Sequence, residues 1–460
     1  MSVHAIAGVV VLNLLLLVAG AGALWAIRGW GSWIEFVRLA GLAYLLGVAV
    51  VGTVLVLELT IRVPFGLATV VVTAFAIAVA GVVVGRVLRR SRPPIREARP
   101  DAARRPAIVH ALGAAVAIVY LEALFRSARL SELSDWDSMA FWVPKAKAIY
   151  YFGGLDHQFF TSLPGASYPP LVPALDAAAF EFMGSADSVT LHLMFWFLFA
   201  GFIAAVAGVL VPRVHPLVLW PCLLFVALTP VFVAHAASPL GDLLLDYFLA
   251  LAILLVALWL VEGQRWPLVL AAFFLVGAMV TKREGLLLAA CVVVSGIAAS
   301  WRRRRSTWPA LMVVAALAFA ATLPWRVWFT TNGIGGEGPG AGYLGFTKNL
   351  SRAWPSVRLT LEVLFNGNFW LGVPIVLLVA IATGLVIRAH VLPAFAGWYF
   401  VLATLGASWV TLSFPSMPIT TNGALNPIVR LSGGIVVPAA GLLPLLLTAA
   451  WRSATAGDER

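Results

Sequence analysis

Charged side chains are scarce in this chain of 460 residues, where Asp, Glu, Lys and Arg together make up only 11%. A soluble globular protein carries about 25%. Hydrophobic residues reach 62%, and the mean hydropathy is +0.97. This excess of apolar side chains is too large for one core surrounded by water. The composition therefore excludes an ordinary soluble domain and indicates that lipid is the main solvent.

Cysteine is also scarce, since the chain has only Cys222 and Cys291. Both lie inside apolar runs, so a framework of disulfide bonds is excluded. The P-loop, HExxH, CxxC and Rossmann glycine patterns are absent from the sequence, and nothing in it predicts a resident cofactor. Asp137 and Asp242 could share a divalent metal, because oxygen-ligand sites leave no spacing signature. No pattern indicates such a site, and we expect no metal.

Long apolar runs are the dominant feature of the chain. A helix needs about 20 apolar residues to cross a bilayer, and thirteen stretches reach or approach that length. The sequence therefore predicts an all-α polytopic membrane protein with about 13 transmembrane helices. The thirteen stretches are Val3–Ile27, Leu39–Leu57, Val63–Val84, Ile108–Leu124, Val189–Val211, Leu217–Val233, Leu243–Val261, Pro267–Val280, Gly285–Ala299, Trp308–Leu323, Leu371–Ile387, Val391–Leu412 and Gly434–Ala450.

Two clusters of arginine give the expected orientation. The segment Arg86–Arg105 contains eight arginines, and Arg302–Arg305 is a run of four. Cytoplasmic loops are enriched in Lys and Arg, so both segments are expected inside. Thirteen alternating spans satisfy both clusters if the N-terminus is outside and the C-terminus is cytoplasmic. We therefore expect a multi-pass protein of the cytoplasmic (inner) membrane.

On this map the long loops are external, at residues 125–188, 329–370 and 413–432. Long loops within compact architectures usually carry function, so the working face is expected to be extracytoplasmic. The spacing of apolar residues in the first two loops predicts short helices that lie in the membrane interface.

The first external loop begins with "SDWDSMAFWVPKAKAIYYFGG", where two acids and two lysines interrupt an apolar chain. Asp135 and Asp137 are expected at the membrane exit, followed by a helix that carries Lys145. One interpretation is structural: an Asp caps the helix and the lysines extend toward water. The other is catalytic, because a carboxylate at a membrane surface has the partial solvation that lets its pKa be tuned.

A second charged motif, "TKREG", joins two apolar runs at a turn expected outside. Lys282 and Arg283 could bind an anion such as phosphate there, with Glu284 beside them, or the three charges could simply solvate a hairpin. Arg430 stands before the last span, where an anion held between it and the helix N-terminus would relieve an unfavourable charge–dipole contact. Tyr168 in "YPPLVP" and Asp242 in "GD" are further polar residues on the expected outer face.

The order of the polar motifs resembles that of the GT-C superfamily of membrane glycosyltransferases. The motifs are, in order, "DWDSMAFWVPKAKAIYYFGG", "YPPLVP", "GD", "TKREG" and an arginine before the final helix. The similarity is to the branch with protein O-mannosyltransferases and the lipid A aminoarabinose transferase. It covers residues 107–450, which would form the GT-C-like catalytic module. It leaves residues 1–88 as three helices without an assigned role, 89–106 as the basic cytoplasmic loop and 451–460 as a cytoplasmic tail.

The resemblance implies transfer of a sugar from a polyprenyl-phosphate donor to a hydroxyl acceptor on a glycan, lipid or protein. It implies that Asp137 is the catalytic base with Asp135 in support, although Asp-Trp-Asp departs from the usual acidic pair and leaves the choice of base open. Lys282, Arg283 and Arg430 would bind the donor phosphate, and Lys145, Tyr168, Asp242 and Glu284 would contact substrate. No nucleic acid is expected as a partner. The alternative is a transporter or flippase for a lipid-linked saccharide, which would place ionisable residues at mid-membrane.

Overall fold

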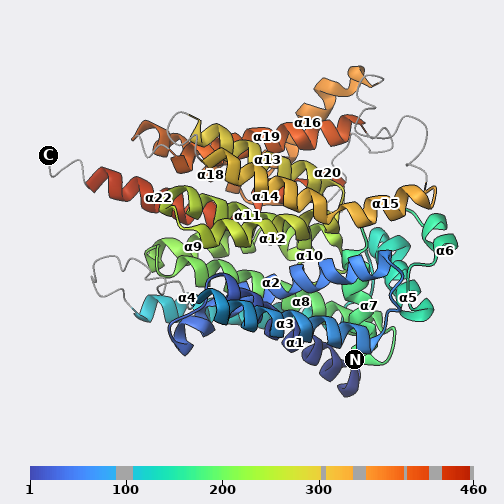
Figure 1. Cartoon of the computed structure of the whole chain (residues 1–460). Helices are drawn as coiled ribbons and strands as arrows, with labels where there is room; N and C mark the ends of the chain where they lie inside the picture. Colours follow the sequence, from blue (N-terminus) through green and yellow to red (C-terminus); the bar gives the residue numbers. More distant parts are fainter. Residues whose placement is uncertain (90–106, 302–306, 335–348, 388–390, 414–426, 456–460) are drawn as a thin grey trace. The chain divides into compact units, whose positions relative to one another are not determined.

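Every regular element that the computed structural model describes is helical (Figure 1). The structure describes residues 1–89, 107–301, 307–334, 349–387, 391–413 and 427–455. Most of the predicted basic loop, the run Arg302–Arg305 and most of the predicted external loop 413–432 lie outside these ranges.

Within the described ranges, nine helical segments are long and apolar enough to cross a membrane. They confirm the prediction of an all-α, multi-pass membrane protein. Seven of these segments are α1 (Val3–Ile27), α2 (Trp33–Thr60), α3 (Leu67–Arg89), α4 (Ala107–Ala128), α8 (Ser188–Leu210), α11 (Gly241–Glu262) and α19 (Val391–Ser413). The other two are composite: α14 (Trp308–Ala321) with α15 (Leu323–Thr331), and the run Pro427–Arg452, which contains α20 (Pro427–Leu431), α21 (Gly433–Val436) and most of α22 (Ala439–Thr455).

The four remaining predicted spans form shorter apolar helices of 10–17 residues. Prolines and tight turns limit them: the predicted span Leu217–Val233, for example, is divided by a turn before Pro230. A helix of this length falls short of the roughly 20 residues that a perpendicular crossing needs. The four helices are α9 (Pro216–Ala227), α12 (Arg265–Thr281), α13 (Glu284–Ser300) and α18 (Val373–Val386).

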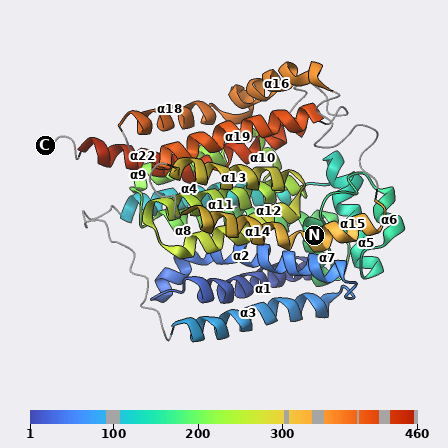
Figure 2. The ribbon, with the colours of Figure 1, turned by 45° about the horizontal axis from the view of Figure 1, so that its top comes forward.

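The chain divides into two compact units. Unit 1 comprises residues 1–220, 235–244 and 321–334, and unit 2 comprises residues 221–234, 245–320 and 335–460. In unit 1, α1 packs between α2 and α3 (Figure 2), and α2 also packs on α8. Small residues allow these helices to approach closely: a Cβ atom on Gly20 would lie 1.8 Å from the carbonyl oxygen of Ala43.

The first external loop folds onto these helices of unit 1. It contains the π-helical turn η1 (Ser138–Trp142), α5 (Val143–Phe152), α6 (His157–Ser162) and α7 (Leu171–Met183). The predicted helix after "SDWDS" is therefore present. The neighbouring helix α7 is buried along almost its whole length against α1, α2 and α5. α7 therefore belongs to the core of unit 1.

In unit 2, α13 packs on α19, and α18 packs on α19 and α22. The second predicted external loop contributes η4 (Leu350–Arg352), α16 (Ala353–Phe365) and α17 (Gly367–Trp370). α16 lies along α19, where Ser408 donates a hydrogen bond of 3.1 Å to Thr360. The short α10 (Pro230–His235) completes the list of helices.

Candidate functional site

The backbone becomes irregular directly after Asp137. Residues Ser138–Trp142 form a π-helical turn between a short α-helical start and α5. A π turn inserts one residue and so changes which face the following side chains occupy; such turns occur frequently at functional sites. Asp135 is buried, with 7% of its surface exposed, whereas Asp137 is half-buried. The two predicted catalytic acids therefore differ in access to solvent.

The loop is held against the segment that begins α11. The hydroxyl of Ser138 donates a hydrogen bond of 2.9 Å to the carbonyl oxygen of Pro239. The ring of Trp142 lies on Gly241 so closely that a Cβ atom there would be 2.8 Å from it. Asp242 follows in the first turn of α11 and is buried. The structure thus brings the predicted "GD" motif close to the loop that carries Asp135 and Asp137, called the acidic loop below, within unit 1.

The first turns of α8 also contain a buried imidazole, His192, with 3% exposure. The Nδ1 atom of His192 lies 2.9 Å from the carbonyl oxygen of Ser188. A donated Nδ1–H in that contact leaves Nε2 as the acceptor of a neutral ring.

Lys145 and Tyr168 belong to an aromatic cluster. The ammonium of Lys145 donates a hydrogen bond of 2.5 Å to the carbonyl oxygen of Gly165 and lies 5.3 Å from the ring centre of Phe141. The rings of Phe141 and Tyr168 stack, with centres 5.7 Å apart. Only 1% of Lys145 is exposed, so this lysine makes a buried cation–π contact, and its role in substrate binding stays a prediction.

A cavity of about 440 Å³ opens beside the acidic loop. Its walls come from the loop, from α5 and from the first turn of α8, and they carry Glu132 and Lys147 as charged groups. Neither side chain forms a hydrogen bond or ion pair with another residue in the described part of the chain. This cavity can offer a carboxylate and an ammonium to a polar ligand. Its full lining is Glu132, Leu133, Met139, Val143, Pro144, Lys147, Ser188 and Val189.

The "TKREG" motif forms the tight turn between α12 and α13 in unit 2. A Cβ atom on Gly285 would lie 2.0 Å from the carbonyl oxygen of Ala278, so only glycine permits this approach. Lys282 and Glu284 are buried, and Arg283 is half-buried. Charges that only solvate a hairpin would be exposed, and this burial therefore favours a specific role for the motif.

Arg430 is likewise buried, in α20 at the start of the last candidate span. The next turn contains Gly433, where a Cβ atom would lie 2.1 Å from an oxygen of Asp246. Gly434 contacts Leu288 of α13. The segment with Arg430 and the helix that begins with Glu284 therefore pack together in unit 2.

The predicted site residues thus fall into two groups. Asp135, Asp137, Lys145, Tyr168 and Asp242 belong to unit 1, and Lys282, Arg283, Glu284 and Arg430 belong to unit 2. A shared cavity for both groups stays a prediction. Among the described residues, no three His, Cys, Asp or Glu side chains form a group suited to a metal ion.

Three polar residues of this region were not predicted from the sequence as site residues. Glu132 and Lys147 line the cavity, and His192 stands one helical turn after Ser188. A signal existed for Lys147, which follows Met139 and Val143 at intervals of four residues. The position of His192 within an apolar run gave no indication of a role near the loop.

Asp176 is a fourth unexpected residue. It lies in the middle of α7 with 1% exposure, and neither carboxylate oxygen has a hydrogen-bond partner in the described part of the chain. Burial raises the pKa of Asp176 well above its ordinary value. One turn further, Phe180 packs its ring 6.0 Å from that of Tyr150 in α5, so Asp176 lies on the face of α7 toward α5.

No protein-family profile, curated protein sequence or solved structure matches this chain.

Proposed function

We propose that this protein is a membrane glycosyltransferase of GT-C type with about 13 spans. It transfers a sugar from a polyprenyl-phosphate donor to a hydroxyl acceptor at the extracytoplasmic face of the cytoplasmic membrane. The observation that carries the proposal is the loop with Asp135 and Asp137: one buried and one half-buried carboxylate directly precede a π-helical turn that is tied to the start of α11. A neighbouring cavity of about 440 Å³ supplies room for a polar group.

The reaction needs one base and one anion site. Asp137 accepts the proton of the acceptor hydroxyl while that oxygen forms a bond to the anomeric carbon. The bond between the anomeric carbon and the phosphate oxygen breaks, and the electron pair leaves with the polyprenyl phosphate. Attack from the face opposite the phosphate inverts the anomeric configuration. The phosphate already carries negative charge, so Lys282, Arg283 and Arg430 stabilise it and no acid is required.

Asp135 has a supporting role in this mechanism. Its burial limits access for an acceptor, whereas Asp137 is half-open. We assign Asp135 to the support of Asp137 and of the loop that carries both acids. We also assign substrate contacts to Asp242 and Tyr168. Asp242 lies close to Ser138 and Trp142, and Tyr168 stacks on Phe141.

The test uses purified full-length protein, short-chain polyprenyl-phosphate sugars and a panel of hydroxyl acceptors, with release of polyprenyl phosphate as the readout. General-base catalysis contributes about 10²- to 10⁴-fold, so Asp137→Asn should lose turnover by that factor and still bind donor. Asp156→Asn is the matched control, since Asp156 caps α6 in the same loop and Asn caps equally well. Near-normal turnover in Asp137→Asn with a collapse in Asp135→Asn would transfer the base role to Asp135. Normal turnover in both variants would refute the catalytic interpretation of the loop.

Asp176 favours a second candidate, a proton-coupled transporter for a lipid-linked saccharide. The carboxyl group of Asp176 is buried without a hydrogen-bond partner in the described part of the chain, and such a group can bind and release a proton during transport. Reconstituted protein would then move a labelled lipid-linked sugar in response to a pH gradient, and Asp176→Asn would abolish this movement. If the wild-type protein moves the labelled sugar at the same rate with and without a pH gradient, this candidate is eliminated.

A further inference from the structure

A groove of about 660 Å³ runs along the surface of α1 and α3 in unit 1. One end is formed by Trp25, Trp30 and Arg86, and the rest is apolar, with Phe75 toward the other end of α3 and Val79 between them. The two helices meet beside the groove through glycines: a Cβ atom on Gly81 would lie 2.2 Å from the backbone of Gly22.

The groove lies at bilayer depth and faces outward. Both helices are candidate spans, and Val79 and Val83 on its wall are 49% and 53% exposed. From Phe75 to Arg86 the helix advances 86 − 75 = 11 residues, or about 16 Å at about 1.5 Å per residue. This length is about half of the roughly 30 Å hydrocarbon core of a bilayer. The groove therefore extends over one leaflet.

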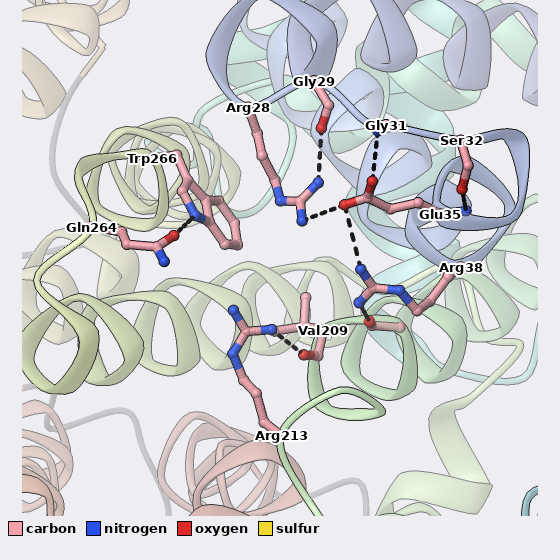
Figure 3. Close-up of polar contacts among 11 residues, drawn as sticks. Arg28, Gly29, Gly31, Ser32, Glu35, Arg38, Val209, Arg213, Gln264 and Trp266 are labelled. Carbon is pink, nitrogen blue, oxygen red and sulfur yellow. Dashed lines mark hydrogen bonds and ion pairs between the residues drawn. The ribbon is translucent and has the colours of Figure 1, made fainter. Parts of the chain in front are cut away.

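Its charged end has an arginine whose charge is not neutralised by a described residue. Arg86 is exposed and forms no hydrogen bond or ion pair within the part of the chain that the structure describes. The arginines at the α1–α2 junction differ: Arg28 and Arg38 both contact Glu35, at 2.6 Å and 3.6 Å (Figure 3). Arg28 and Arg38 thus share one internal carboxylate, whereas no described residue offers a carboxylate to Arg86.

Trp25 and Trp30 pack edge to face, with ring centres 4.7 Å apart, and a Cβ atom on Gly85 would touch Trp25. Tryptophan is enriched at the level of lipid headgroups. Two tryptophans and an arginine at one end of an apolar groove match an amphiphile whose head is anionic.

We propose that this groove binds one anionic glycerophospholipid of the surrounding leaflet, with its phosphate at Arg86 and an acyl chain along Val79 toward Phe75. The length of one leaflet matches an acyl chain and is too short for an extended polyprenyl chain. This site gives α1 and α3 a lipid-binding role and does not depend on the proposed glycosyl transfer.

The test is native mass spectrometry of the full-length protein in detergent with phosphatidylglycerol or phosphatidylcholine of equal chain length. The wild type should retain phosphatidylglycerol preferentially. Arg86→Gln should reduce that preference about fivefold, as expected for one arginine near a membrane surface. Val79→Trp, which fills the groove, should reduce retention of both lipids.

Two matched variants control for general effects. Val72→Trp changes an exposed residue of α3 that does not line the groove, and Arg129→Gln removes an exposed arginine beyond the end of α4. Both should retain the wild-type pattern. An unchanged preference in Arg86→Gln, or undiminished phosphatidylglycerol in Val79→Trp, would overturn the proposal. Displacement of phosphatidylglycerol by polyprenyl phosphate would overturn the choice of lipid, and a shift from dimer to monomer in Val79→Trp would assign the groove to a second copy of the chain.

Discussion

Ser138 and Pro239, 101 residues apart in the sequence, are joined by a hydrogen bond of 2.9 Å in which the serine hydroxyl donates to the proline carbonyl. Ser138 is fully buried and is the first residue of the π-helical turn. This bond therefore fixes the position of the backbone that carries Asp135 and Asp137 relative to the start of α11.

Replacement of this serine should affect activity more than stability. We expect Ser138→Ala to lower the free energy of unfolding by about 0.5–1.5 kcal/mol, the net value of one hydrogen bond. The loss of turnover should correspond to a larger free energy than this loss of stability, because a small displacement of the catalytic Asp137 is costly. Thermal unfolding and release of polyprenyl phosphate measure the two effects. Ser131→Ala is the control, since Ser131 bonds only within its own turn, to Ser127. Equal effects of both substitutions would contradict a positioning role for Ser138.

The cationic residues of unit 2 should act on the donor. Lys282→Gln, Arg283→Gln and Arg430→Gln each remove one charge from a buried or half-buried position. Loss of a charge-assisted contact of about 1.5–3 kcal/mol should raise the KM for donor about 10- to 150-fold while turnover at saturation changes less. Steady-state kinetics against donor concentration gives both values.

Arg358→Gln is the matched control for these variants. Arg358 is an exposed arginine of unit 2 that pairs with Glu362 at 2.7 Å on α16, and such exposed pairs contribute little. Its KM should stay at the wild-type value. If all three cationic variants behave as Arg358→Gln does, the "TKREG" turn and Arg430 have no part in donor binding.

The sequence was sufficient to predict elements that depend on local pattern. Apolar length located the spans, and the charged turn at Lys282 correctly separated α12 from α13. It also indicated a helix after "SDWDS". The length of the individual helices was less predictable, because one proline such as Pro230 can divide an apolar run while it lowers the mean hydropathy of that run only slightly.

Features that depend on tertiary packing could not be predicted. Lys145 lies in a pattern typical of a solvated interfacial helix, yet α6 and the Gly165 turn cover it. Asp176 stands in "YPPLVPALDAAAF", where nothing indicates that α1, α2 and α5 will enclose α7. The π turn shifts the register by one residue, so no helical spacing from the sequence places Asp137 correctly on a face.

The orientation in the membrane is testable with single cysteines in a variant without Cys222 and Cys291. Pro164 is exposed in the first loop expected outside, and Arg265 is exposed as the first residue of α12. A membrane-impermeant thiol reagent added to intact cells should label Pro164→Cys and should leave Arg265→Cys unmodified until the cells are opened. Labelling of Arg265→Cys alone in intact cells would reverse the orientation and place the acidic loop in the cytoplasm.

Asp176 should make stability depend on pH. Because burial raises the pKa of Asp176 in the folded protein above its ordinary value of 3.8, the unfolded chain releases this proton at a lower pH than the folded one does. The unfolded state therefore binds fewer protons between these two pKa values, and the free energy of unfolding falls as the pH rises through that window. The stability associated with the protonated carboxyl group is complete below the ordinary value and is lost progressively toward the folded pKa. The slope is at most about 1.4 kcal/mol for each pH unit.

Asp176→Asn retains the shape of the side chain and cannot ionise. The substitution should therefore remove the part of the pH dependence of stability that comes from Asp176. We expect the unfolding temperature of Asp176→Asn to exceed that of the wild type, by a margin that grows as the pH rises above the ordinary value of 3.8 toward the folded pKa. Asp176→Leu, which removes the polar group as well, should show the same dependence with a different offset. Thermal unfolding of the three purified proteins in detergent at each pH gives the comparison. A difference in unfolding temperature that stays constant with pH would mean that the carboxyl group titrates alike in the folded and unfolded chains. That result would refute a buried, protonated Asp176. It would also remove the support that this residue gives to a proton-coupled transporter.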